Sequence, residues 1–123
     1  MKAKSYRDLE IYRLSYELAM KIHHMSLNLP KYELYEEGSQ VRRSSKGVAS
    51  CIVEGYGRRK YKNDFIRFLI YAQASCDETE THLNFIHDFG YISKDLYEEL
   101  KEDNDKLGKK LNKFIQYVEA QWK

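Results

Sequence analysis

The chain has 123 residues, of which 42% are hydrophobic and 33% are charged, and it contains one proline. This composition is typical of a mostly helical globular protein, and the length is enough for a single domain, residues 1–123, with a buried core. No apolar run approaches the ~20 residues that a membrane-spanning helix needs, so the sequence predicts no membrane contact.

The N-terminal stretch MKAKSYRDLE lacks the apolar segment of a secretion signal. The two cysteines, Cys51 and Cys76, stand apart in the sequence and form no CxxC pair. We therefore expect a cytoplasmic protein whose thiols are reduced.

Four long helical segments are predicted in chain order, because apolar residues recur at spacings of three and four. They run from about Tyr6 to Asn28, from Glu33 to the Gly55–Gly57 region, from Asn63 or Asp64 to Gly90, and from Ser93 to about Gln121. Pro30 ends the first segment, and Asn63, Asp64 and Ser93 are good N-cap residues. Long helices of similar length with short connections predict an all-α, antiparallel up-down-up-down four-helix bundle.

In each of the last three segments, one apolar stripe is predicted to face the core. These stripes are Val41, Ser45, Val48, Ile52 and Tyr56; then Phe65, Leu69, Ala72, Cys76, Thr79, Leu83 and Ile86; then Leu96, Leu100, Leu107, Leu111, Phe114 and Val118. The opposite side of the second segment carries Gly47 and Ser50, which are small enough for another backbone to approach closely.

The first segment carries two apolar stripes on nearly opposite sides. One contains Leu9, Tyr12, Tyr16, Met20, His23 and Leu27, and the other contains Ile11, Leu14, Leu18, Ile22, Met25 and Leu29. A bundle core needs only one stripe, and an exposed apolar patch of this size usually marks an interface. We therefore predict a homo-oligomer rather than a thicker monomer core that uses both stripes. Its interface is assigned to Ile11, Leu14, Leu18, Ile22, Met25, Gly47, Ser50, Tyr71 and Phe85.

The net charge is only +2, but the charges are segregated along the chain. Residues 42–67 hold eight basic side chains, whereas residues 77–105 hold ten acidic ones. Four of the cations, Arg58, Arg59, Lys60 and Lys62, lie in the stretch EGYGRRKYKND between the second and third segments. Such a connection is either a solvated turn or a docking site for a polyanion.

No catalytic or metal-binding pattern is present in the sequence. A di-iron bundle needs Glu-x-x-His on two helices, but no histidine here has a carboxylate three residues before it. The stretch GYGRRK lacks the GK[ST] of a phosphate-binding loop. We therefore expect no enzyme, no cofactor and no metal. Glu78 and Glu80 are interpreted as cross-helix partners of Arg43 or Arg67, and together with Glu54 these residues are assigned to structural ion pairs.

Several short motifs are specific enough to indicate a family. They are SQVRRS at 39–44, EGYGR at 54–58, FIRFL at 65–69, ETE at 78–80 and the pair Gly90-Tyr91. The chain resembles, over nearly its whole length, the bacterial four-helix-bundle family encoded in intervening sequences of the large-subunit ribosomal RNA gene. The resemblance implies an antiparallel bundle that assembles into a ring-like homopentamer. The family is also similar to the accessory bundle protein of diversity-generating retroelements, whose basic surface engages nucleic acid and a reverse transcriptase.

Three positions, Cys51, Val53 and His82, depart from the family pattern. Where the family usually reads Asn-Ile-Ala-Glu-Gly, residues 51–55 are Cys-Ile-Val-Glu-Gly, and His82 stands where a glutamine is usual. Glu54, Arg43 and Arg58 are in place.

A ring would gather the basic turns of five subunits into a collar of about twenty cations that binds phosphate backbones by counterion release. Tyr56 and Tyr61 would stack on unpaired bases. We assign nucleic-acid binding, with structured RNA favoured, to Arg42, Arg43, Lys46, Tyr56, Arg58, Arg59, Lys60, Tyr61 and Lys62. The alternative is an oligomeric scaffold without nucleic-acid binding, which offers a protein partner the basic turn or the acidic stretch from Glu98 to Asp105.

Overall fold

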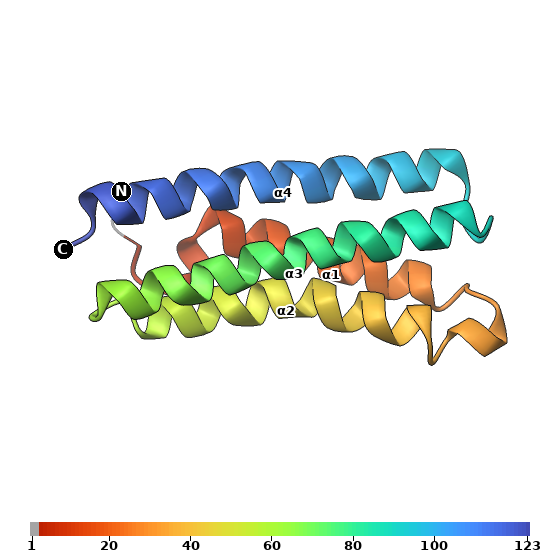
Figure 1. Cartoon of the computed structure of the whole chain (residues 1–123), viewed down its shortest axis with the longest axis horizontal. Coiled ribbons are helices and arrows are strands. Elements are labelled where there is room, and N and C mark those ends of the chain that lie inside the picture. The colour runs from red at the N-terminus through yellow and green to blue at the C-terminus, as the bar shows by residue number, and fades with distance from the viewer. Residues whose placement is uncertain (1–2) are drawn as a thin grey trace.

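A computed structural model describes residues 3–123 and is all-α (Figure 1). Its four long helices are α1 (Glu10–Ser26), α2 (Glu37–Gly57), α3 (Lys62–Asp88) and α4 (Lys94–Gln121), and two short 3₁₀ helices are η1 (Tyr6–Asp8) and η2 (Lys31–Glu33). The prediction of four helices is confirmed, and no strand occurs in residues 3–123. Residues 1–2 lie outside the described residues. Two predictions include them: the N-terminal stretch without a secretion signal, and the single domain of residues 1–123. Within the described range, no helix has the length and apolarity needed to cross a membrane.

Helix boundaries follow local capping chemistry. Ser5 caps η1, because its Oγ accepts a hydrogen bond from the Arg7 backbone N–H at 3.0 Å. Leu9 then has an extended backbone, so α1 begins at Glu10 and not near Tyr6 as predicted. Ser93 caps α4 as predicted, because its Oγ accepts from the Leu96 N–H at 3.1 Å.

The start of α3 differs from the predicted caps, whereas its end lies at the predicted glycine. The helix begins at Lys62, and its N-cap residue Tyr61 makes no side-chain cap, so the capping role predicted for Asn63 or Asp64 is wrong. At the other end, Gly90 has a φ of +82°, a left-handed conformation that glycine adopts without strain. This turn lets the Tyr91 N–H donate to the Ile86 carbonyl at 3.1 Å and closes the helix.

The core lies between the four helices, where α2 packs against α3, α3 against α4, and α1 against both α2 and α4. All five predicted core residues of α2 and all seven of α3 are buried. On α4, Leu96 and Phe114 are only half-buried, and the core also includes Asn104 and Ile115. Periodicity therefore identified the inward face of three helices.

Two polar contacts cross this core. The Thr79 Oγ1 donates to the Ser44 Oγ at 2.9 Å and joins α3 to α2. The Asn104 Nδ2 donates to the Cys76 carbonyl at 3.0 Å, and the Cys76 Sγ donates to the Asn104 Oδ1 at 3.3 Å, which joins α4 to α3. Because buried polar groups are costly without partners, these contacts favour one register between the helices.

The assignment of the two stripes on α1 is wrong. Ile11, Leu18, Ile22 and Met25, which were assigned to an oligomer interface, are at most 5% exposed and form part of the core, and Leu14 is half-buried against it. The exposed side of α1 instead carries Tyr16, Met20 and Leu27, at 53%, 47% and 56% exposure. The physical reason is that the exposed stripe also contains Tyr and His, whose polar ends tolerate contact with water, whereas the buried stripe is wholly apolar.

Candidate nucleic-acid interface

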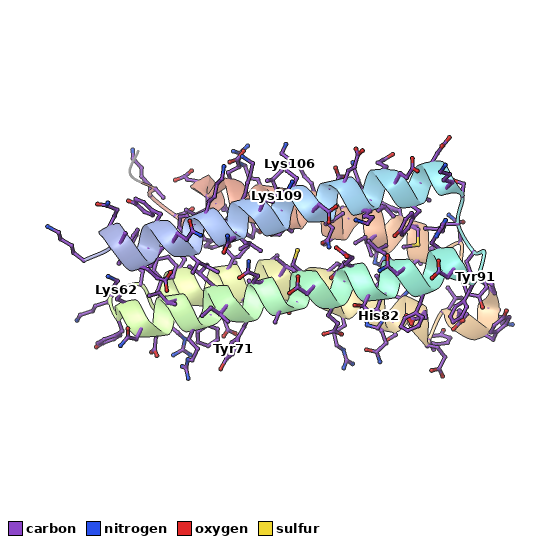
Figure 2. The ribbon with its side chains drawn as sticks, turned by 45° about the horizontal axis from the view of Figure 1, so that its top comes forward. Lys62, Tyr71, His82, Tyr91, Lys106 and Lys109 are labelled. Atoms are coloured by element: carbon purple, nitrogen blue, oxygen red, sulfur yellow. The ribbon has the colours of Figure 1, made fainter. Side chains whose placement is uncertain are left out.

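The connection between α2 and α3 lies at the end of the bundle where α4 ends (Figure 1). Two hydrogen bonds tie it to the C-terminal residues, and a third ties the preceding residue Tyr56 of α2 to the N-terminal segment. The Trp122 Nε1 donates to the Arg59 carbonyl at 3.0 Å, the Lys62 Nζ donates to the Glu119 carbonyl at 2.8 Å, and the Tyr56 hydroxyl donates to the Ala3 carbonyl at 3.1 Å. The connection, which we call the basic turn (residues 58–62), is therefore held in a fixed position. Figure 2 shows Lys62 at this end of the bundle and Tyr91 at the opposite end.

Glycine allows α2 and α3 to come close together just before the turn. Gly55 is buried, and a Cβ added there would lie 3.2 Å from the Phe68 Cβ and 3.4 Å from the Phe65 carbonyl. After Gly57, the Arg58 N–H donates to the Gly55 carbonyl at 3.0 Å and the Tyr61 N–H donates to the Arg58 carbonyl at 2.9 Å. The chain thus reverses within a few residues.

Two of the four cations of the basic turn are positioned by neutral groups. The Arg59 guanidinium lies 4.0 Å from the centre of the Tyr56 ring and donates to the Tyr56 carbonyl at 2.9 Å. Lys62 is fixed by its bond to the Glu119 carbonyl. Because the partners of these two groups are carbonyls and a ring, the positive charges are oriented but not neutralised.

The other two cations, Arg58 and Lys60, are exposed. Arg58 lies over the Phe68 ring at 4.8 Å and approaches the Asp64 carboxylate at 4.0 Å, which is the limit of an ion pair. The Lys60 Nζ is exposed and lies 5.8 Å from the centre of the Tyr61 ring. Asp64 is in closer contact with Arg67, at 3.3 Å. The turn therefore presents four positive charges with little local compensation.

Two residues assigned to nucleic-acid binding have internal roles instead. Tyr56 is 6% exposed, and one face of its ring is covered by Arg59, so it cannot stack on a base as predicted. Arg42 is half-buried and donates to the Ser26 Oγ at 2.9 Å and to the Leu34 carbonyl at 2.8 Å. These bonds join α2 to the end of α1 and the following loop. Tyr61, at 64% exposure, is available for stacking.

Arg43 and Lys46 are exposed but do not belong to the basic turn. Fifteen helical positions separate Arg43 from Arg58, which corresponds to about 22 Å along α2. Arg43 and Lys46 instead border a shallow hollow of about 470 Å³ on the side of α2. The residues assigned to nucleic-acid binding thus form two separate groups.

The structural ion pairs predicted between helices do not form within residues 3–123. Arg67 contacts Asp64 on its own helix, and Arg43, Glu54 and Glu80 take part in no ion pair there. Glu78 instead lies 3.3 Å from His82 on its own helix.

The contact between α2 and α3 that the ion-pair assignment missed joins Glu37 to His82. Their Oε2 and Nδ1 atoms are 2.8 Å apart, and both side chains are less than 20% exposed. Figure 2 labels His82 on α3. His82 is one of the positions that depart from the family pattern, and Glu37 is the first residue of α2.

Groups suited to covalent or metal chemistry are not assembled in the described part of the chain. Burial raises the pKa of the Cys76 thiol to about 12, and burial together with Glu54 raises the pKa of Cys51. A nucleophilic cysteine needs the opposite shift. Across residues 3–123, no group of three or more His, Cys, Asp or Glu side chains is placed to hold a metal ion.

Exposed apolar side chains lie on two faces of the bundle. A groove of about 640 Å³ between α1 and α2 is bordered by Tyr16, Met20 and Val53. On α3, Tyr71 and Phe85 are each 47% exposed, as their assignment to an interface requires.

Gly47 was expected to let another chain approach. A Cβ added there would lie 3.3 Å from the Ser75 Oγ, so the small size of Gly47 serves the contact of α2 with α3.

Comparison with known proteins places the chain among helical bundles. A family model described as 23S rRNA-intervening sequence protein matches residues 7–113. A crystal structure of a protein of unknown function from the S23 ribosomal protein family of Bacteroides thetaiotaomicron superposes with a TM-score of 0.74. The match has 25% sequence identity and covers 85% of this chain and 97% of that chain. No curated protein matches the sequence.

Proposed function

Because the chain belongs to the family of 23S rRNA-intervening sequence proteins, we propose that it is a non-catalytic, oligomeric bundle that binds structured RNA through the basic turn between α2 and α3. The observation that supports this proposal is the charge of the turn. Of its four cations, only Arg58 approaches a carboxylate, at 4.0 Å, among the residues that the structure describes.

A phosphate backbone is the partner that this charge pattern favours. Arg59 and Lys62 lose little conformational freedom on binding, because backbone carbonyls already position them. Arg58 and Lys60 are free to adjust to the spacing of phosphates. The turn carries no arrangement of side chains that reads base edges, so binding depends on shape and charge, and sequence preference is weak.

The proposed assembly is a ring of antiparallel up-down-up-down bundles, with the pentamer favoured. Its contact surface is the exposed face of α1 with the adjoining groove along α2, which carries Tyr16 and Met20, and the exposed side of α3, which carries Tyr71 and Phe85. Burial of these side chains between subunits stabilises the ring, because apolar area is removed from water. The basic turns of all subunits then lie at the same end of the ring and act on one RNA molecule together.

The proposal is tested by fluorescence anisotropy with a labelled RNA hairpin at low salt. The double variant Arg58→Gln with Lys60→Gln removes two charges without touching the hydrogen bonds that hold the turn. The matched control, Lys31→Gln with Lys94→Gln, removes two exposed charges at the opposite end. We expect the first variant to bind at least tenfold more weakly and the control to bind as the native protein does. Equal weakening by both variants would show that only total charge matters and would contradict a site at the turn.

The second candidate function is an oligomeric scaffold that binds a protein partner. The exposed apolar side chains on two faces of the bundle favour it, because such a patch marks a protein interface whether the partner is another subunit or a different protein. The acidic stretch is less suited to the contact, since Glu99 and Asp103 lie 3.2 and 2.8 Å from Lys21, and Asp105 lies 3.0 Å from Lys101. Protein purified at low salt as an intact oligomer distinguishes the two functions. A raised ratio of absorbance at 260 nm to that at 280 nm supports RNA binding, and a clean ratio supports the scaffold.

A further inference from the structure

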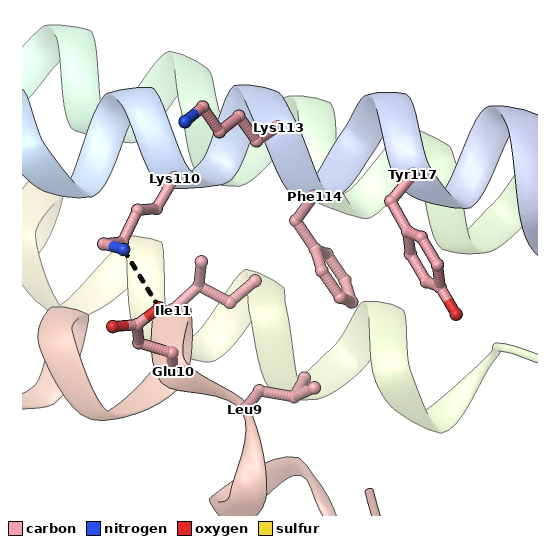
Figure 3. A pocket seen from close by; sticks show the side chains of 7 residues that line it. All are labelled: Leu9, Glu10, Ile11, Lys110, Lys113, Phe114 and Tyr117. Carbon is pink, nitrogen blue, oxygen red and sulfur yellow. Dashed lines mark ion pairs between the residues drawn. The ribbon is translucent and has the colours of Figure 1, made fainter. Parts of the chain in front are cut away.

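Two adjoining hollows lie between the N-terminal segment and the last turns of α4. Their volumes are about 290 and 580 Å³, and they share Leu9, Glu10, Phe114 and Tyr117. Figure 3 shows the smaller one, with Leu9 and Ile11 facing Phe114 and Tyr117 across it. We call the two together the terminal hollow. Their volumes are in the range of small-molecule sites.

The wall formed by α4 and the C-terminus is aromatic. Tyr117 is 49% exposed, and its ring lies 6.0 Å from that of Phe114 and 6.5 Å from that of Trp122. Trp122 is held in place, because its Nε1 donates to the Arg59 carbonyl at 3.0 Å and its ring packs edge-on against Phe65 at 5.0 Å. The hollow therefore offers positioned ring surfaces that are open to solvent on one side.

Positive charge borders these rings. Lys113 is exposed and lines the smaller hollow, and Arg59 of the basic turn lines the larger one. Glu10 is paired with Lys110 at 3.1 Å, drawn as a dashed line in Figure 3. Asp8 accepts backbone N–H groups at 2.9 and 3.2 Å, which orient its carboxylate but leave its negative charge. Among the lining residues the three cations Lys110, Lys113 and Arg59 outnumber the two carboxylates Glu10 and Asp8, so the site favours an anion.

We propose that the terminal hollow binds one unpaired nucleobase of the RNA, stacked on Tyr117, with the neighbouring phosphates on Lys113 and Arg59. An apolar cavity with a half-exposed aromatic ring and cations at its border matches the chemistry of a nucleotide, which has a flat apolar base and an anionic backbone. The inference rests on the proposed function, because Arg59 belongs both to the basic turn and to this hollow. The base is bound through its ring face, so the site accepts any of the four bases.

The single tryptophan of the chain reports directly on this site. Trp122 lines the larger hollow, so a base that enters it quenches the intrinsic tryptophan fluorescence. The probe is a single-stranded hexa-adenylate, and the control ligand is a hexamer of the same charge that lacks bases. We expect hexa-adenylate to quench Trp122 and to bind about tenfold more tightly than the abasic hexamer.

Two variants test whether Tyr117 causes the difference in affinity between hexa-adenylate and the abasic hexamer. Tyr117→Ala should bind both hexamers with the affinity that the native protein has for the abasic one, whereas Tyr117→Phe should keep the tenfold difference. Equal binding of both hexamers to the native protein, without quenching, would overturn this inference and leave the basic turn as a phosphate site. No binding of either hexamer or of the hairpin at low salt would overturn the proposed function as well.

Discussion

Replacing Ile22 by alanine, and separately Met20 by alanine, tests which side of α1 forms the core. Ile22 is fully buried and Met20 is 47% exposed, although both stripes of the helix are apolar. We expect Ile22→Ala to lower the free energy of unfolding strongly and Met20→Ala to change it little.

The magnitude for Ile22 follows from the atoms removed. The substitution deletes three buried carbons, each worth about 0.8 kcal/mol, and leaves a cavity that adds about 1 kcal/mol. The expected loss is therefore about 3 kcal/mol, a large share of the ~5–15 kcal/mol that stabilises a typical domain. Met20 gains less from folding because half of its surface stays in water, so its loss should be below ~1 kcal/mol.

The assay is urea unfolding followed by circular dichroism at 222 nm. Because assembly also stabilises the folded state, unfolding is measured at several protein concentrations and light scattering gives the mass. Equal losses for the two variants at a concentration where both are monomeric would refute the assignment of the core side.

Three further predictions follow from contacts in the structure. Above pH 9, ionisation of Cys76 should lower the free energy of unfolding of the native protein by about 1.4 kcal/mol per pH unit. The cause is that the buried thiol stays protonated until its pKa of about 12, whereas the thiol of the unfolded chain ionises. The Cys76→Ala variant should lack this decline in parallel urea titrations. Arg42→Met should cost about 1–3 kcal/mol of unfolding free energy by thermal melting, since two acceptors lose their donor, and leave RNA affinity unchanged. Met20→Glu should reduce the mass measured by light scattering, because a charge cannot be buried between subunits without a partner.

Each of these predictions has a result that would contradict it. Identical pH curves for the native protein and the Cys76→Ala variant would show that the thiol does not titrate as its burial requires. An Arg42→Met variant that keeps its melting temperature but loses RNA binding would return Arg42 to the RNA site. An unchanged mass for Met20→Glu would place the subunit contact elsewhere.

How far the sequence predicts the fold differs between helices. The inward face of α3 was predicted in full because its seven core positions recur at helical spacing and its other side is mostly polar. The two sides of α1 were confused because both carry apolar residues at the same spacing. The useful distinction was chemical: the buried side contains Ile, Leu and Met25 with the small residues Ser15 and Ala19, and the exposed side contains Tyr and His beside its apolar residues.

The candidate site was predicted less completely than the fold. The basic turn itself was located from local composition. The hydrogen bonds that hold the turn and the preceding residue Tyr56 were not predicted, because their acceptors come from distant parts of the chain. Tyr56 donates to the Ala3 carbonyl, and Lys62 donates to the Glu119 carbonyl. Trp122 carried no periodic signal, and only packing shows that it supports the turn. Charge counting along a sequence cannot separate a cation that holds the fold from one that faces solvent.

The salt dependence of RNA binding tests the central claim most directly. The affinity of the native protein and of the variant with Arg58→Gln and Lys60→Gln is measured by anisotropy from about 50 to 200 mM salt, with equal oligomer mass confirmed. If the basic turn binds phosphates, the affinity of the native protein should fall steeply as the salt concentration rises. Its slope of log affinity against log salt should be reduced by about 1.5 in the variant for each subunit in contact. A native affinity that does not change with salt, or an identical slope for both proteins, would contradict a phosphate-binding turn.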